Sequence, residues 1–429
     1  MQIECFPEAP AAWPRKVFAD VAAVNPTYRL DKSTSYPFIE MAAVAENFGG
    51  IISYDYRKAD ASGLARFKAG DILFGKITPC AENGKVALVK DLPSEFGLGS
   101  TEFIVLSPRN GNDRRFVYAM ACANPVRGRA VSRMEGSTGR LRVTEDVFTK
   151  WLVVAAPPQP EQRAIADILD AVETAIERTR TAIEKAQRLK RGLMQRAFSC
   201  GTRRAALKST DLGHAPVNWD VIKGKEAFKT LGGATASQIW FVREGQDPDA
   251  WFMKVDDFND PANQRRIVGT QRGFRMAENP KIETLPVGTV VIAKRGAAIE
   301  KNRVRVTTVP VTLDPNLMGL RLSDGLGSEF FRYQLEWRRL SRFCENSGVP
   351  QLNNKDLYPR PFLRPPPDEQ EEIVGVLRAA EDHEDRINDV LLNLERLKRG
   401  LMQDLLTGRR RVPVNNAADT KTMGTLQAA

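Results

Sequence analysis

Two segments of the chain carry apolar residues at the alternating three- and four-residue spacing of a helix seam. In residues 157–195 the seam consists of Ile165, Leu169, Val172, Ile176, Ile183, Ala186 and Leu193. In residues 365–403 it consists of Ile373, Leu377, Ala380, Ile387, Leu391, Leu394 and Leu401. Such spacing over four heptads is typical of coiled coils and predicts two long helices packed through these seams. A helix of about 38 residues is about 57 Å long.

The two segments are copies of one another, aligned without a gap at an offset of 208 residues. They agree at 17 of 39 positions, and their last eight residues, RLKRGLMQ, are identical. The sequences before them also correspond: Gly70–Phe74 matches Gly288–Ile292, and Gly136–Val147 parallels Ser347–Leu357. A glycine followed by an apolar run predicts a turn that enters a buried strand. The chain is therefore interpreted as domain, long helix, domain, long helix.

Both globular domains mix predicted strands and helices. Short apolar runs such as Ile72–Phe74 and Phe103–Leu106 predict strands, whereas Phe116–Ala123 and Glu329–Cys344 predict helices, so the fold class is α/β. The expected boundaries are a first domain at 1–156, a helix at 157–205, a second domain at 206–364, a helix at 365–411 and a tail at 412–429. The tail is polar and has no periodicity, and we expect it to be disordered.

The long helices carry further features that recur in both copies. Glu161 and Glu369 fall in the first turn, where the helix dipole favours a negative charge. Gly192 and Gly400 lie within the identical ending and predict a kink or the close approach of another helix. The basic residues beside these glycines are Arg188, Lys190, Arg191, Arg396, Lys398 and Arg399. They either complement the helix dipole on a solvated face or contact a partner subunit or a phosphate.

Composition narrows the function further. Lys and Arg number 63 against 53 Asp and Glu, and the net charge of +10 allows a polyanionic partner without requiring one. No apolar run approaches the roughly 20 residues of a membrane span, and the first ten residues lack the apolar segment of a signal peptide. Five scattered cysteines without a CxxC pair argue against disulfides and zinc and fit a reducing cytoplasm. The only histidines, His214 and His383, leave little room for a histidine metal site or a catalytic triad.

Three motifs that would indicate catalysis are incomplete. Gly70–Lys76 has the GxxxxGK spacing of a phosphate-binding loop, but Ile77 stands where Ser or Thr would hold magnesium. Asn25–Tyr28 reads NPTY and is close to the NPPY of amino-methyltransferases, but no glycine-rich cofactor loop precedes it. Asp249 lacks the downstream Glu-x-Lys that a magnesium-dependent nuclease needs. We therefore expect no catalytic centre, cofactor or metal site.

Basic and amide side chains gather in loop-like stretches of both domains. The candidates in the first domain are Arg133, Ser137, Thr138, Arg140 and Arg142. Those in the second are Lys294, Arg295, Lys301, Arg303, Arg305, Gln351, Asn353 and Asn354. Arg reads guanine and Asn or Gln reads adenine through paired hydrogen bonds, whereas Lys and Arg also neutralise phosphates regardless of sequence. The alternative is that these residues are solvated surface charge.

The layout resembles the DNA specificity subunit of type I restriction–modification systems over nearly the whole chain. The resemblance is carried by the PPxxEQxxI openings at Pro157 and Pro365, the RLKRGLMQ endings, the Gly-Ser-Thr loop at Gly136 and the Ser-Gly stretch at Ser347. It implies that each domain is a target recognition domain for one half of a split double-stranded DNA site. It also implies that the two helices pack antiparallel as a spacer, and that the chain itself has no catalytic activity. The implied partners are two modification subunits, which methylate adenine with S-adenosylmethionine, and motor–nuclease restriction subunits.

The repeat agrees with this resemblance on physical grounds. It generates a pseudo-two-fold axis within one chain, an arrangement that suits two half-sites on one duplex. Because the two domains have diverged, the half-sites should differ and the site should be asymmetric. Two other functions stay open at this point. One is a methyltransferase or nuclease with its own recognition domains, and the other is a coiled-coil interaction protein without a DNA role.

Overall fold

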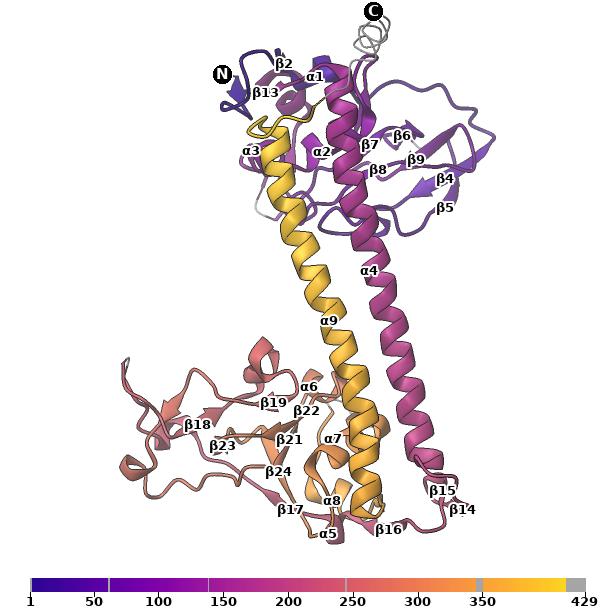
Figure 1. The fold of residues 1–429 in the computed structure, drawn as a ribbon. Helices are drawn as coiled ribbons and strands as arrows, with labels where there is room; N and C mark the ends of the chain where they lie inside the picture. Colours follow the sequence, from indigo (N-terminus) through magenta and orange to yellow (C-terminus); the bar gives the residue numbers. More distant parts are fainter. Residues whose placement is uncertain (1, 61, 138, 244, 345–349, 414–429) are drawn as a thin grey trace, which may run out of the picture. The chain divides into compact units, whose positions relative to one another are not determined.

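The chain folds into two compact units that divide within the long helices. The computed structural model describes residues 2–60, 62–137, 139–243, 245–344 and 350–413. Unit 1 comprises Met1–Arg180 with Asp389–Ala429, and unit 2 comprises Thr181–Asn388. The division falls within α4 (Gln159–Cys200) and α9 (Pro367–Leu406). Each unit therefore holds one α/β domain and part of each helix, which confirms the predicted fold class (Figure 1).

The helices α4 and α9 lie side by side within each unit (Figure 1). The polar contacts between them are Glu173 with Lys398 and Arg180 with Glu395 in unit 1, and Gln187 with Glu384 and Lys190 with Glu381 in unit 2. Residue numbers rise along α4 as those of their partners fall along α9. The two helices are therefore antiparallel, as expected.

The residues assigned to the helix seam are buried or half-buried throughout. The buried members are Ile165, Leu169, Ile176, Ala186, Ile373, Leu377 and Ala380. Half-buried are Val172, Ile183, Leu193, Ile387, Leu391, Leu394 and Leu401. By contrast, Leu189 and Leu397 lie outside the predicted seam and are 56% and 50% exposed. This contrast supports the seam, whose residue-by-residue assignment stays a prediction.

The described residues of unit 1 form four small sheets, and the strands of each are given in the order in which they are hydrogen-bonded to one another. The first sheet consists of β1 (Ile3–Glu4), β13 (Leu152–Ala155) and β2 (Arg15–Val17), and the second of β3 (Ala22–Val24), β10 (Phe103–Pro108), β7 (Ile72–Gly75) and β8 (Val86–Leu88). The third consists of β5 (Asp55–Lys58), β4 (Ser35–Ile39), β9 (Phe96–Gly99) and β6 (Ala65–Lys68). The fourth pairs β11 (Met134–Glu135) with β12 (Arg142–Val143). Its shorter helices are α1 (Phe18–Val21), α2 (Arg114–Cys122) and α3 (Asn124–Val131).

Unit 2 follows a related plan. Its sheets are β14 (Leu207–Thr210) with β15 (Gly213–Pro216); β16 (Asp220–Lys223) with β25 (Pro361–Arg364); β17 (Phe228–Leu231), β24 (Leu317–Leu322), β21 (Val290–Ala293), β22 (Val304–Thr307) and β19 (Arg266–Ile267); and β20 (Gly273–Phe274), β18 (Ala250–Met253) and β23 (Val311–Leu313). Its shorter helices are α5 (Gly224–Ala227), α6 (Ala297–Glu300), α7 (Ser328–Arg338) and α8 (Asn354–Leu357).

The two domains share one sheet plan, as the repeat predicts. In unit 1, β7 pairs antiparallel with β10, with Phe74 opposite Ile104, and in unit 2 β21 pairs antiparallel with β24. Strands β8 and β3 flank the first pair, and β22 and β17 flank the second. The turns into β7 and β21 place Gly70 at φ 95° and Gly288 at φ 87°, a left-handed backbone that glycine adopts without steric cost. The predicted turn before a buried strand is therefore confirmed in both halves.

Tight packing of apolar side chains fixes each domain against its helices. In unit 1, Phe74 and Phe18 both contact Phe148 edge-on at 5.1 Å, and Ile165 of α4 belongs to the same buried cluster. The helix α2 begins after Asp113, whose side chain accepts hydrogen bonds from the first free backbone N–H groups and caps the helix. The core thus joins the sheet to the long helix, so the domain does not stand free of it.

One predicted helix is interrupted. The stretch Glu329–Cys344 forms α7 followed by a separate 3-10 turn, Leu340–Phe343. Arg339, between them, has φ 64° and leaves the right-handed helical region. The strands predicted at Ile72–Phe74 and Phe103–Leu106 are confirmed as β7 and β10.

The motifs that resemble catalytic signatures have structural roles. Gly70–Lys76 consists of a turn and strand β7, so its apolar residues belong to the sheet. Asn25 follows β3, and its Oδ1 accepts the backbone N–H of Val105 at 2.8 Å. Across the described ranges, no helix has both the length and the apolar character to cross a membrane. Nor do three or more His, Cys, Asp or Glu side chains in those ranges gather where they would hold a metal ion.

Candidate functional site

The glutamate of each PPxxEQ opening is hydrogen-bonded to a buried tryptophan. Trp13 Nε1 donates to Glu161 Oε2 at 3.2 Å, and Trp219 Nε1 donates to Glu369 Oε2 at 2.9 Å. All four side chains are buried, where a carboxylate that has lost its water requires such donors. Glu161 also accepts hydrogen bonds from Arg411, beyond the end of α9. The helix-dipole interpretation of these glutamates is therefore incomplete, because each also ties the start of a long helix to its domain.

The glutamine of the same opening clamps the domain to the helix from a second side. Gln162 Nε2 donates to the carbonyl oxygen of Pro157 at 2.8 Å, and its Oε1 accepts the N–H of Asp113 at 2.9 Å. Gln370 repeats both contacts, with the carbonyl of Pro365 at 2.8 Å and the N–H of Gly327 at 2.8 Å. In each unit the clamp holds the residue just before α2 or α7. The repeated EQ pair thus fixes how each domain is mounted on its helix.

The tryptophan anchor leads to a prediction about stability. Replacing Trp219 by Phe removes the only side-chain donor to Glu369 among the described residues and should destabilise unit 2 by about 2–3 kcal/mol. Replacing Trp13 by Phe should cost less, because Glu161 keeps Arg411. Urea unfolding followed by circular dichroism measures both values. Trp240→Phe is the control, because Trp240 is 77% exposed, and equal losses for all three variants would contradict the anchor.

The lysine of the RLKRGLMQ ending joins the two long helices. Lys190 pairs with Glu381, and its repeat equivalent Lys398 pairs with Glu173. Both pairs link positions that are identical in the two copies. These two lysines therefore serve the helix pair instead of facing solvent, whereas Arg188 and Arg396 are exposed. Glu recurs at 173 and 381, and Lys recurs at 190 and 398. This recurrence of opposite charges in both copies is the sequence signal that could have indicated the contact.

The close approach predicted at the repeated glycines is wrong within the part of the chain that the structure describes. A Cβ atom added at Gly192 or Gly400 would meet no heavy atom within 4 Å. Both residues lie inside uninterrupted helix. The glycines thus leave an open place on the helix surface.

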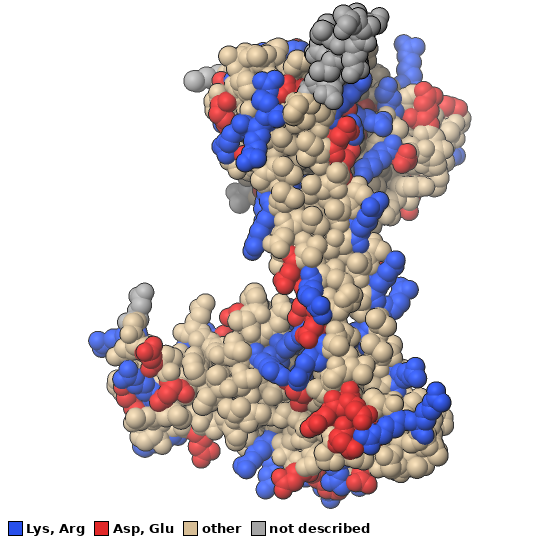
Figure 2. Space-filling model, viewed as in Figure 1, with Lys and Arg blue, Asp and Glu red and all other residues tan. Residues whose placement is uncertain are grey.

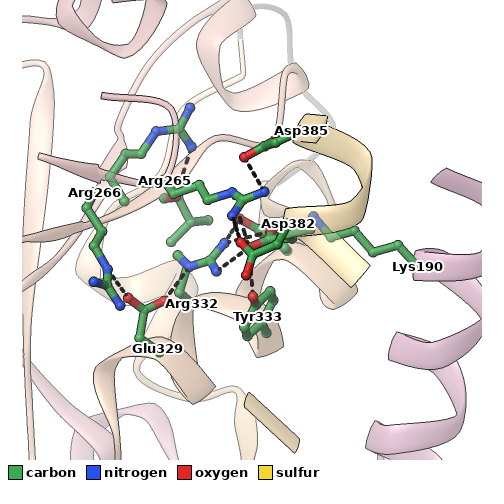
Figure 3. A network of polar contacts seen from close by, with 12 residues as sticks. Lys190, Arg265, Arg266, Glu329, Arg332, Tyr333, Asp382 and Asp385 are labelled. Atoms are coloured by element: carbon green, nitrogen blue, oxygen red, sulfur yellow. Dashed lines mark hydrogen bonds and ion pairs between the residues drawn. The ribbon is translucent and has the colours of Figure 1, made fainter. Parts of the chain in front are cut away.

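A polar network in unit 2 joins its α/β domain to both long helices (Figure 3). Arg332 of α7 donates to Glu381 Oε2 at 2.9 Å, and Tyr333 Oη donates to the same oxygen at 2.7 Å. Lys190 of α4 lies 2.5 Å from Glu381 Oε1. Arg265, beside β19, reaches α9 through Asp382 at 2.7 Å. The buried carboxylate of Glu381 on α9 thus forms ion pairs with a lysine of α4 and an arginine of the α/β domain.

The charges around Glu381 explain its acidity. Burial alone would raise the pKa of Glu381, but the positive charges and hydrogen bonds of Arg332 and Lys190 outweigh it and lower the pKa to about 2. Burial and the negative charge of Glu381 raise the pKa of Tyr333, which stays a neutral hydrogen-bond donor. The network therefore holds an ionised carboxylate in the interior, a state that depends on every partner being in place.

Unit 1 uses a different and more exposed set of charges at the corresponding joint. Arg115 of α2 contacts Asp167 at 2.7 Å and Asp170 at 3.0 Å on α4, as well as Asp113 at 3.3 Å. These carboxylates are partly exposed, so the pairs are screened more than those of Glu381. The two domains are thus mounted at equivalent places with unequal electrostatic strength.

One candidate DNA-contacting residue of unit 1, Arg142, lies beside the loop that follows β7. Arg142 bridges to Ile77 in that loop, and its guanidinium grips Glu102 through bonds of 2.8 and 2.9 Å. Hydrogen bonds from Arg142 lower the pKa of Glu102. Arg133 stacks over the ring of Trp151 at 4.8 Å. Ser137 and Arg140 are exposed, and Thr138 lies outside the described residues.

The corresponding residues of unit 2 are arranged in the same way around the loop after β21. Arg295 in this loop bridges to Gln351, just as Ile77 bridges to Arg142 in unit 1. Asn353 caps α8, and its backbone N–H is held by Asp356 at 2.8 Å. The further members Lys294, Lys301 and Asn354 lie half-buried or exposed near this loop or at the ends of α6 and α8. The structure therefore brings together two candidate stretches that are about 55 residues apart in the chain.

Two arginines of the second set hydrogen-bond to backbone carbonyl oxygens within unit 2, and one of them, Arg305, is buried. Arg305 is 7% exposed, and its guanidinium donates to the carbonyl oxygens of Asn263 at 2.5 Å and Val304 at 2.9 Å. Burial lowers the pKa of Arg305 to about 10. Arg303 donates to the carbonyl oxygen of Phe258 at 2.9 Å and stays half-buried. Because Arg305 is buried within β22, it is unsuited to contact DNA. Its place in a basic run of the sequence did not indicate this burial.

The surface carries both signs of charge. Figure 2 shows Lys and Arg side chains interspersed with Asp and Glu over the visible face of each unit, without one continuous positive area. The net charge of +10 is therefore not enough to locate a nucleic-acid surface. Local clusters of charge are more informative than the total.

Comparison with known proteins supplies a family. A family model described as the type I restriction modification DNA specificity domain matches residues 19–187. The putative type I restriction enzyme MjaX specificity subunit of Methanocaldococcus jannaschii is 23% identical over 420 residues, which cover 94% of this chain and 95% of that protein. The EcoEI specificity subunit of Escherichia coli is 28% identical over 162 residues, covering 37% of this chain and 27% of the relative.

Solved structures share the fold. A chain from a study of complex assembly and conformational transition of the type I restriction–modification system superimposes with a TM-score of 0.61 at 18% identity, covering 94% of this chain and 99% of that one. The S subunit of a type I system from M. genitalium gives a TM-score of 0.52 at 16% identity, with 92% and 96% covered. At these identities the likeness concerns the fold alone, and it extends over both domains and both helices. Family model, relatives and repeated architecture agree, and the chain is similar along nearly its whole length to the specificity subunits of type I restriction–modification systems.

Proposed function

We propose that this subunit reads an asymmetric, bipartite site in double-stranded DNA, with one half-site for each α/β domain. The observation that carries the proposal is the duplicated mounting of the domains. Each is fixed to a long helix by the same Trp–Glu contact and the same glutamine clamp, and the same Glu–Lys pair joins the two helices in each unit. Two domains that share these contacts and differ in their loops are what the reading of two unlike half-sites requires.

The domain division follows from the same reasoning. We assign residues 1–156 and 206–364 to two target recognition domains, 157–205 and 365–411 to the spacer helices, and 412–429 to a tail. Residues 414–429 lie outside the described ranges. The start of α4 at Gln159 and of α9 at Pro367 supports the placement of both joints.

The residues proposed to contact DNA include Arg142, beside the loop after β7, and the Arg295–Gln351 bridge after β21. In the first domain they comprise Arg133, Ser137, Thr138, Arg140 and Arg142. In the second they comprise Lys294, Arg295, Lys301, Arg303, Gln351, Asn353 and Asn354, with Arg305 left out because it is buried. The pairing of Arg295 with Gln351 supports this choice, because it places an arginine opposite a glutamine, two residue types that read bases.

The subunit acts as a scaffold without catalysis of its own. Relatives bear the name of specificity subunits, and the duplicated helices offer two equivalent places where two modification subunits would bind. Those subunits would supply S-adenosylmethionine-dependent methylation of adenine, and restriction subunits would supply the motor and the nuclease. The alternative, a methyltransferase or nuclease that carries its own recognition domains, is not favoured by the family comparison.

The test is co-expression with the modification subunits, followed by long-read mapping of methylated adenines. The expected result is a split motif with unlike halves and an unread spacer. In parallel, the isolated chain should not retain labelled S-adenosylmethionine. Stoichiometric retention of the label, or a continuous methylated motif, would contradict the proposal.

A further inference from the structure

A basic hollow of about 990 Å³ lies in unit 2, between α4, the end of α7 and the 3-10 turn that follows it. Seven Lys or Arg residues line it against three Asp or Glu. They come from separate elements: Arg191 from α4, Lys301 from the end of α6, Arg339 and Arg342 from the 3-10 turn and its start, and Arg360 from the segment before β25. None of these five belongs to the buried network around Glu381.

The acidic residues of the basic hollow do not balance its charge. Glu336 is engaged by Arg332 at 2.9 Å, Glu384 accepts a hydrogen bond from Gln187 at 2.9 Å, and Asp211 is exposed. The lining therefore holds four more cationic than anionic side chains. Within the described ranges, Arg191, Arg339 and Arg342 form no ion pair, and all three are exposed. Their guanidinium groups are therefore available to a negatively charged ligand.

The floor of the basic hollow is rigid and itself positive. Trp337 stacks on Phe198 at 5.0 Å and donates to Gln195 Oε1 at 2.9 Å. Arg338 packs its guanidinium over Phe343 at 4.6 Å and donates to the carbonyl oxygen of Pro361. Burial and the neighbouring charge of Arg360 lower the pKa of Arg338 to about 10. A guanidinium in such surroundings without a carboxylate partner gains from a nearby anion.

We infer that the basic hollow binds backbone phosphates of the DNA duplex and extends the contact surface of the second domain onto the spacer helix α4. The inference rests on the proposed function and assigns these residues to affinity, not to sequence reading, because phosphate contacts are the same for every sequence. It gives α4 a second role, since Arg191 belongs to the helix and not to the recognition domain.

A phosphate backbone fits the hollow better than a partner protein does. Protein interfaces draw their energy from exposed aromatic and large apolar anchors. Met194 and Phe343 in the hollow are buried, and Leu212 and Trp337 are half-buried, so the hollow offers no exposed large apolar side chain among the described residues. The hollow offers instead arginines that come from different elements of unit 2. Such spaced positive charges suit the successive phosphates of a DNA backbone.

The position of the hollow agrees with a DNA ligand. Lys301, at its edge, directly follows α6, which begins one residue after Gly296. The N–H of Gly296 is bonded to the carbonyl oxygen of Pro350 at 2.9 Å, beside the Arg295–Gln351 bridge of the proposed reading surface. The two surfaces are therefore connected through a single short helix.

The test uses the complex of this chain with its modification subunits and a duplex that carries the mapped site. The variant is Arg191→Gln/Arg339→Gln/Arg342→Gln, and the control is Arg188→Gln/Arg196→Gln/Arg204→Gln, which removes three exposed charges outside the hollow. Fluorescence anisotropy over a series of salt concentrations gives the affinity and its salt dependence. Loss of three phosphate contacts should lower affinity about 10- to 100-fold at low salt and reduce the slope of log K against log salt by about 2–3. The control should bind like the unsubstituted chain, and the methylated motif should stay the same.

The outcomes separate this inference from the proposed function. If the unsubstituted complex binds no specific duplex, the proposed function fails. If it binds a specific duplex and the hollow variant has the same affinity and salt slope as the control, the inference about the hollow is overturned. Retained DNA binding with loss of a modification subunit from the complex would also overturn it, and would assign the hollow to a protein partner.

Discussion

Replacing Glu381 by Gln should lower the free energy of unfolding of unit 2 by about 3–5 kcal/mol at neutral pH, because it removes the most deeply buried counter-charge of Arg332 and Lys190 and leaves them only Glu329 and Glu336 among the described residues. Arg332 is 2% exposed and donates twice to the carboxylate, and Lys190 lies 2.5 Å from it. Glutamine has nearly the same shape, so the loss reports charge and hydrogen bonding instead of packing. Hydrogen exchange of α7 and of the first half of α9 would locate the loss in unit 2.

The effect of this substitution should depend on pH in a defined direction. The folded-state pKa of Glu381, about 2, lies below its ordinary value of 4.5. Its ionised form therefore stabilises the fold fully above about pH 4.5, and this contribution disappears as the pH falls towards 2. The difference in stability between the unsubstituted chain and Glu381→Gln should shrink over that window. A difference that stays constant from pH 7 to pH 3 would show that the charge of Glu381 is not the cause.

Two control variants sharpen the result. Glu371→Gln changes an exposed glutamate on the same helix and should be nearly neutral. Glu173→Gln changes the repeat equivalent in unit 1, whose side chain is 24% exposed and pairs with Lys398 alone among the described residues, so the loss should be smaller than for Glu381. Equal losses at Glu173 and Glu381 would contradict the unequal mounting of the two domains.

Inserting one heptad into both long helices should lengthen the unread spacer of the DNA site by about three base pairs. Seven residues add about 10.5 Å to a helix and rotate it by only about 20° from a full number of turns, so the seam and the cross-helix pairs keep their faces. One base pair occupies about 3.4 Å of duplex. The insertions belong next to Arg180 and Asn388, at the division between the two units. Methylated-adenine mapping measures the spacer directly.

Separate insertions test the coupling of the two helices. A heptad in α4 alone shifts Lys190 relative to Glu381 while leaving Glu173 opposite Lys398, so it should destabilise the subunit and abolish methylation. A heptad placed after Pro413 should change nothing. An unchanged spacer in the double insertion would remove the spacer role from the helices.

The long helices and the repeat were predictable because they depend on local periodicity. Seam residues such as Ile165 and Ile373 recur at spacings that only a helix satisfies, and both are buried. The strands around Phe74 were likewise predictable, because an apolar run after a turn glycine has few alternatives. The repeat alignment also predicted a turn followed by a buried strand at the same place in both domains.

Long-range polar contacts were not predictable from the same patterns. Nothing in the spacing around Glu381 indicates that Arg332 and Tyr333 are its partners, since they lie 49 and 48 residues away in the chain. Arg305 illustrates the opposite failure. Its place in a basic run suggested exposure, but β22 turns its side chain to the interior. The close approach predicted at Gly192 was wrong for a related reason. The sequence shows that this residue has no side chain, but it does not show which atoms lie beside it.

The most direct test of the account is an exchange of the second domain, residues 206–364, for its counterpart from another specificity subunit, followed by mapping of methylated adenines. If each domain reads its own half-site, one half of the motif changes, while the other half and the spacer stay the same. If both halves change together, or if neither does, the two domains do not read independently and the account is wrong.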